Sequence, residues 1–216
     1  MENKKLCAAE LLDKAGKQAT DSKEYCMLGL SYLHKVFPGM DKSLREVPYD
    51  PAKAIAYLKM SFDLGDRKAG RYLGLCCQEG VGTKKNEQEA YAYFYAALER
   101  GDDTSALLCA DYLLDGKIVP QNIERALKLC CGVGERHGHD AANAFWKLGE
   151  IYSNGKYLPR DDLAAKKYFE ACVECAGTDN MELSKKAQEA LQNLRDLPEK
   201  KAEANSSVSN HHNKTA

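Results

Sequence analysis

Hydrophobic and polar positions along this chain follow a helical pattern that returns at intervals of 36, 36 and 39 residues. Each copy begins with an Asp or Asn followed four residues later by Ala, and such a side chain can cap the first turn of a helix. Large residues stand seven and eight positions after the cap, which is the spacing of one buried helical stripe. We therefore predict four equivalent helices. Their caps are Asp50, Asn86, Asn122 and Asp161, the large pairs begin at Tyr57, Tyr93, Leu129 and Tyr168, and the helices are predicted to run to Gly65, Gly101, Gly138 and Gly177.

A second helix is predicted before each cap, because a large residue followed by a small one recurs there. Glycine inside a helix is unfavourable by propensity, so it indicates that a neighbouring helix approaches closely at that point. The repeating unit is therefore helix A, a glycine-containing turn and helix B. The pairs are Leu28 with Gly29, Leu73 with Gly74, Cys109 with Ala110 and Leu148 with Gly149, and three of them are followed by the turn glycines Gly80, Gly116 and Gly155.

The domain organisation follows from these copies, and we expect an all-α fold. The first copy carries an insertion at about 34–49. Terminal helices can shield the exposed ends of a repeat array, so the flanking helical segments are interpreted as caps. The polar end of the chain is predicted to be disordered. The predicted segments are an N-terminal capping helix at 1–19, repeats at 20–66, 67–103, 104–140 and 141–180, a C-terminal capping helix at 181–200 and a tail at 201–216.

The pattern resembles the Sel-one-like repeat (SLR) family, which is related to the tetratricopeptide repeats. The resemblance covers about 20–180, and the third copy departs from it with Cys109 and Ala110 in place of Leu and Gly. It implies a right-handed α/α superhelical solenoid that acts as an adaptor in protein complexes, and it implies no particular reaction. The residues that carry it are Ala69, Leu73, Gly74, Gly80, Asn86, Ala90 and Tyr93, and then Ala144, Leu148, Gly149, Tyr152, Gly155, Asp161, Ala165, Tyr168 and Phe169.

Composition and charge narrow the possible partners. The formal net charge is −1, whereas nucleic-acid binding usually needs a basic stripe that neutralises phosphates. No apolar run is long enough for a membrane span, and the N-terminus does not read as a signal peptide. We therefore expect a cytoplasmic monomer with a protein or peptide partner, no nucleic acid and no membrane. Nine cysteines, an odd number, are expected to be mostly thiols in that compartment.

An enzymatic alternative comes from the cysteine-rich branch of the SLR family, some members of which are described as penicillin-binding or β-lactamase-like. That branch pairs a cysteine at the end of helix B with one in the next helix A, but here Ala97 precedes Cys109. Ser153 and Lys156 have the Ser-x-x-Lys spacing of penicillin-reactive enzymes, but Gly155 interrupts the helix between them. We therefore predict no enzymatic activity and no catalytic residue.

A metal or redox alternative rests on the cysteines and histidines between 130 and 175. Zinc needs four nitrogen or sulfur ligands that converge on a tetrahedron, whereas free cysteine also packs as a small hydrophobe. We favour packing and predict no metal and no cofactor. The glycine-rich stretch 80–85 lacks the Walker spacing, so we interpret it as a repeat turn. The residues of the alternative are Cys130, Cys131, His137, His139, Cys172 and Cys175.

The remaining candidate is a surface made by helix A, which by analogy with tetratricopeptide arrays lines the concave side. Trp146 is the only tryptophan, and it is either an interface hot spot or a packing residue between repeats. Carboxylates in the set either favour a partner with Lys or Arg, or form a solvated face. The predicted partner-binding residues are Arg71, Leu75, Gln78, Glu79, Asp111, Leu114, Asp115, Trp146, Glu150 and Asn154.

Overall fold

A computed structural model describes residues 18–33 and 49–194 of the protein, and this part of the chain contains helices and no strand. The all-α fold predicted from the sequence is confirmed. The predicted N-terminal helix, nearly all of the insertion, the end of the C-terminal helix and the tail lie outside the described residues. The chain divides into two compact units, Met1–Gln121 and Asn122–Ala216, which are described separately below.

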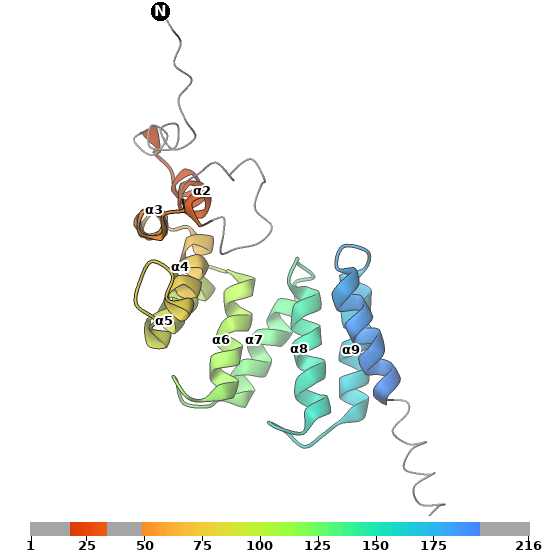
Figure 1. The fold of residues 1–216 in the computed structure, drawn as a ribbon. Coiled ribbons are helices and arrows are strands. Elements are labelled where there is room, and N and C mark those ends of the chain that lie inside the picture. The colour runs from red at the N-terminus through yellow and green to blue at the C-terminus, as the bar shows by residue number, and fades with distance from the viewer. Residues whose placement is uncertain (1–17, 34–48, 195–216) are drawn as a thin grey trace, which may run out of the picture. The chain divides into compact units, whose positions relative to one another are not determined.

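The described residues of unit 1 form two complete helix pairs and the helix A of a third. Helices α2 and α3 pack together, as do α4 and α5, and α6 follows against α5 (Figure 1). The third predicted repeat contributes only its first helix to this unit, because the boundary falls between α6 and α7. The helices are α2 (Ser22–Tyr32), α3 (Pro51–Asp63), α4 (Arg67–Glu79), α5 (Glu87–Glu99) and α6 (Asp103–Asp115).

Unit 2 contains α7 (Ile123–Glu135), α8 (Ala141–Asn154), α9 (Asp162–Ala176) and a last helix at 181–194. Helix α8 packs closely against α9 and also against α7. The last helix lies within the segment 181–200 that the sequence analysis interprets as a cap, and its Ala187 is completely buried. Ala187 belongs to an apolar cluster with Phe169 and Cys172 of α9, so this helix covers the apolar side of the α8–α9 pair.

The four predicted helix-B caps are confirmed by hydrogen bonds. Asp50 accepts from the backbone N–H of Lys53 at 3.0 Å, and Asn86 accepts from that of Glu89 at 3.2 Å. In unit 2, Asn122 and Asp161 accept in the same way at the starts of α7 and α9. Each side chain therefore satisfies a backbone donor that the first helical turn leaves unpaired.

The close approach predicted at the small helix-A residues is also confirmed. A Cβ atom built on Gly74 would lie 2.4 Å from a ring carbon of Phe94, and one on Gly149 would lie 2.5 Å from Phe169. A Cβ atom on Gly29 would lie 2.7 Å from the Leu58 side chain. The large residue of helix B therefore packs directly on the helix-A backbone of its own repeat.

One predicted helix end is wrong. The helix that begins after Asn122 was expected to run to Gly138, but α7 ends at Glu135. The chain turns before the glycine because His137 takes the left-handed conformation, with φ 50°, and its N–H bonds to the carbonyl of Gly134. A histidine tolerates this conformation better than a β-branched residue does, so glycine is not required at the turn.

Candidate protein-interaction surfaces

The predicted partner-binding residues fall into both compact units. Unit 1 holds seven of them, on α4 and α6, and unit 2 holds three, on α8. They are therefore considered as two surfaces. In unit 1 they are Arg71, Leu75, Gln78, Glu79, Asp111, Leu114 and Asp115, and in unit 2 they are Trp146, Glu150 and Asn154.

Arg71 connects the second repeat to the third. Its guanidinium donates to Asp102 at 3.3 Å and to the Thr104 hydroxyl at 2.5 Å, and it lies 5.2 Å from the ring centre of Tyr72. Asp102 is only 5% exposed and also accepts from the backbone and hydroxyl of Ser105, so it caps α6. With 17% of its side chain exposed, Arg71 offers a partner little surface and instead stabilises the start of α6.

The apolar and amide members of the set in unit 1 differ in their accessibility. Leu75 and Gln78 are partly buried on α4. Leu114 is 4% exposed, so its side chain belongs to the core and presents almost no contact area to a ligand. Helical spacing alone does not distinguish such a residue from its exposed neighbours, because both stand within one turn of the same stripe.

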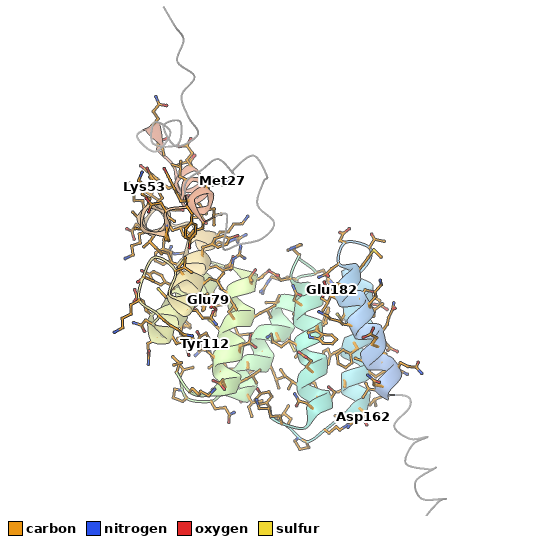
Figure 2. The ribbon with its side chains drawn as sticks, viewed as in Figure 1. Met27, Lys53, Glu79, Tyr112, Asp162 and Glu182 are labelled. Carbon is orange, nitrogen blue, oxygen red and sulfur yellow. The ribbon has the colours of Figure 1, made fainter. Side chains whose placement is uncertain are left out.

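Exposed carboxylates remain at the C-terminal ends of α4 and α6. Glu79, Asp111 and Asp115 are all exposed, and Asp115 pairs with Lys117 at 3.0 Å on the surface. Glu79 lies close enough to α6 to act on Tyr112 (Figure 2), whose pKa is raised by burial and then by Glu87, Cys109 and Glu79. We call these three residues the acidic patch of unit 1.

In unit 2, Trp146 packs within its own repeat. Its ring centre lies 5.2 Å from that of Phe169, at an interplanar angle of 48°, and it joins the apolar cluster of α8, α9 and the last helix. The side chain is only partly buried, so an edge remains accessible. Glu150 and Asn154, further along α8, are exposed.

A groove between α2 and α4 contributes a basic surface that the sequence analysis missed, apart from Arg71. Its volume is about 710 Å³. The sequence does carry a signal for this basic surface, because basic residues lie in the first turns of both α2 and α4. Their convergence depends on how α2 and α4 face each other across the groove, which the sequence pattern does not state. The lining residues are Ser22, Lys23, Cys26, Met27, Leu30, Gly65, Asp66, Arg67, Lys68, Arg71 and Tyr72.

The cysteines of the described residues are free thiols, and most are buried. Burial raises the pKa of Cys76 to about 12 and that of Cys172 to about 11, so both stay protonated at neutral pH. Metal binding and redox exchange use the thiolate. No group of three or more His, Cys, Asp or Glu side chains within 18–33 and 49–194 is arranged to hold a metal ion. His137, His139 and Cys175 do border one hollow of about 350 Å³.

Ser153 and Lys156, the pair with Ser-x-x-Lys spacing, each bind another group. The Ser153 hydroxyl donates to the carbonyl of Glu150 at 3.2 Å. The Lys156 ammonium donates to the Tyr157 hydroxyl at 2.8 Å and lies 4.6 Å from the centre of its ring. Gly155 ends α8 between them in a left-handed conformation, as the sequence predicts. A nucleophilic serine would instead need the lysine beside it as a base.

The repeats identify the family. The Sel1 repeat model matches 39–66, 69–102, 105–130 and 142–171, which is more than half of the chain. The protein therefore belongs to the Sel1 repeat family, and its fold is an all-α solenoid of SLR repeats. Sel1 repeats are generally protein–protein interaction modules on a non-catalytic scaffold.

Solved structures agree with this fold. A Sel1 repeat protein from Oxalobacter formigenes is 22% identical, with a TM-score of 0.62 over 88% of this chain and 76% of that one. A protective antigen of uropathogenic Escherichia coli that displays an SLR fold is 19% identical, with a TM-score of 0.61 over 89% of this chain and 45% of that one. A comparison with curated protein sequences finds no match. Within the described ranges, no helix has the length and apolar character needed to cross a bilayer.

Proposed function

We propose that this protein is a non-enzymatic adaptor that binds a segment of a partner protein on the helix-A faces of its repeats. The observation that carries the proposal is the division of helix A into two sides. One side is packed against helix B, with Gly74 and Gly149 in contact with aromatic rings. The other side of α4 and α6 presents the exposed acidic patch, which takes no part in the apolar core. Such a division leaves helix A free to contact a ligand.

The chemistry of the patch favours a partner segment with Lys or Arg. Opposite charges across an interface speed association and exclude partners of the wrong sign. Glu79, Asp111 and Asp115 would supply this complementarity in unit 1, and Glu150 would supply it in unit 2. The proposal includes a monomeric protein in the cytoplasm, a placement that the eight free thiols of the described residues support.

The experiment is a capture of partners by the tagged full chain from its native cell, repeated with two charge-reversal variants. Glu79→Lys with Asp115→Lys reverses the acidic patch. Asp63→Lys with Glu99→Lys reverses two exposed carboxylates at the ends of α3 and α5, and so serves as the matched control.

We expect a set of proteins that the unmodified chain and the control capture and that the acidic-patch variant loses. The loss should reappear as at least a tenfold weaker affinity for the purified partner, since several surface charge pairs become repulsive. Equal capture by all three forms would contradict a binding site on this face of helix A.

A further inference from the structure

The groove between α2 and α4 combines an apolar floor with a basic rim. Cys26 is 5% exposed, and Leu30 and Tyr72 are partly buried. Met27 of α2 (Figure 2) also lines the groove, with 61% of its surface exposed. Burial and the neighbouring Asp66 carboxylate raise the pKa of Cys26 to about 11, so its thiol adds no charge to the floor.

The rim carries more positive than negative charge. Lys23, Arg67 and Lys68 are exposed, and Arg71 stands beside them with its guanidinium directed to Asp102. Asp66 is the one acidic residue among the described lining residues. Its carboxylate already accepts from the backbone N–H groups of Lys68 and Ala69, so it is engaged as the cap of α4. The whole chain has a formal charge of −1, so this excess is local.

We propose that the α2–α4 groove binds an acidic segment of the partner protein, with Asp or Glu side chains on the rim and an apolar side chain on the Met27 floor. The inference rests on the proposed adaptor function and specifies the charge of a second part of the partner. Charge complementarity selects the sign, because an acidic segment meets three exposed cations, whereas a basic one meets repulsion. The apolar floor favours a peptide over a nucleic acid, whose phosphates would gain little from Met27 and Leu30.

The position of the groove also implies an order of charges along the partner. Arg71 and Glu79 are eight residues apart on α4, a distance of about 12 Å along a helix axis. The basic groove lies at the start of α4 and the acidic patch at its end. A partner segment that follows α4 would therefore place acidic residues at the groove and basic residues toward Glu79.

The test uses the purified full chain and a displayed library of random twelve-residue peptides. The groove variant carries Lys23→Glu and Lys68→Glu, and the control variant carries Lys59→Glu and Lys84→Glu, which reverse two exposed lysines outside the lining. Lys23 and Lys68 lie in the first turns of α2 and α4, where a glutamate interacts favourably with the helix dipole. The groove variant is therefore expected to fold, and its thermal unfolding checks this.

Besides any basic peptides that bind the acidic patch, we expect selected peptides that are rich in Asp and Glu and carry at least one large apolar residue. Their affinity should fall about tenfold in the groove variant and stay within twofold in the control. A selection without acidic peptides, or equal losses of their affinity in both variants, would overturn the proposal. So would a twelve-nucleotide single strand that binds more tightly than the peptides and is lost in the groove variant.

The two proposals fail separately. If captured partners depend on Glu79 and Asp115 but not on Lys23 and Lys68, the adaptor function stands and the acidic-segment proposal is wrong. If acidic peptides depend on Lys23 and Lys68 while reversal of the acidic patch changes nothing, the groove stands and the predicted site at the patch is wrong.

Discussion

At the scale of single residues, the position that decides packing is the small residue of helix A. In three repeats it is a glycine, and the large helix-B residue opposite it is Leu58, Phe94 or Phe169. In the third repeat the sequence carries Ala110 with the smaller Cys130 at the equivalent positions. In the sequence, the larger small residue therefore stands with the smaller helix-B residue.

The first prediction is that Gly74→Ala destabilises the protein although alanine is the better helix former. The added methyl group would lie 2.4 Å from a Phe94 ring carbon, so the ring or the helix must shift. Overpacking of this kind costs about 1–3 kcal/mol in the free energy of unfolding, which chemical denaturation measures. Adding Phe94→Leu to Gly74→Ala should recover part of the loss.

The control for this prediction is Gly132→Ala in α7. A methyl group there meets only the tip of the flexible Arg136 side chain, at 3.6 Å. The substitution should leave stability unchanged or raise it by up to about 1 kcal/mol, since glycine is a poor helix former. If both substitutions stabilise the protein equally, the close contact between α4 and Phe94 at Gly74 is not present.

At the scale of elements, the helices begin where side chains can cap them. The caps of helix B are predicted from the sequence, and those of helix A at Asp21, Asp66 and Asp102 appear only in the structure. Asp140 precedes α8 without a side-chain hydrogen bond to the helix backbone. Residue type at the cap therefore marks a helix start, but the strength of the cap depends on the local backbone geometry.

The second prediction compares two caps. Asn86→Ala removes the acceptor for the Glu89 N–H and should lower the free energy of unfolding by about 1 kcal/mol. Asp140→Ala should cost less, because no capping bond to the α8 backbone is lost. Urea denaturation of the two variants beside the unmodified protein measures the difference, and a larger loss from Asp140→Ala would contradict this assignment.

At the scale of the whole molecule, buried thiols connect stability to pH. The pKa of Cys76 is raised to about 12, mainly by burial, and those of Cys26 and Cys172 are raised to about 11. A raised pKa means that the folded state holds the proton more tightly than the unfolded state. The contribution of these thiols is complete below the unfolded pKa of about 9 and is lost as pH rises toward the folded values.

The third prediction is that the free energy of unfolding falls as pH rises from about 9 to 11. Replacing Cys76 and Cys172 by alanine should make this decline shallower, although it also lowers stability at neutral pH by leaving cavities.

A fourth prediction concerns the accessibility of two thiols. When the native protein is alkylated at pH 8 and its peptides are mapped by mass spectrometry, Cys175 should react far faster than Cys76, because Cys175 is exposed and Cys76 is buried. Rapid alkylation of Cys76 in the native protein would show that this side chain is not buried.

Local patterns in the sequence determined the helical repeat. Cap position, stripe spacing and small helix-A residues each depend on a few neighbouring residues, so the four caps and the close contacts at Gly74 and Gly149 were predictable. The same reasoning placed the end of α7 too late, because a turn at His137 depends on local geometry that no spacing rule contains.

Tertiary packing decided which surface residues are available. Arg71 was predicted as a contact residue, but its bonds to Asp102 and Thr104, more than thirty residues away, hold most of it in the fold. Leu114 is buried and Trp146 packs on Phe169 for the same kind of reason. The basic groove exists because α2 and α4, separated by α3 in the chain, line its two sides. Long-range contacts of this kind depend on how helices pack in space, and a periodic sequence does not specify them.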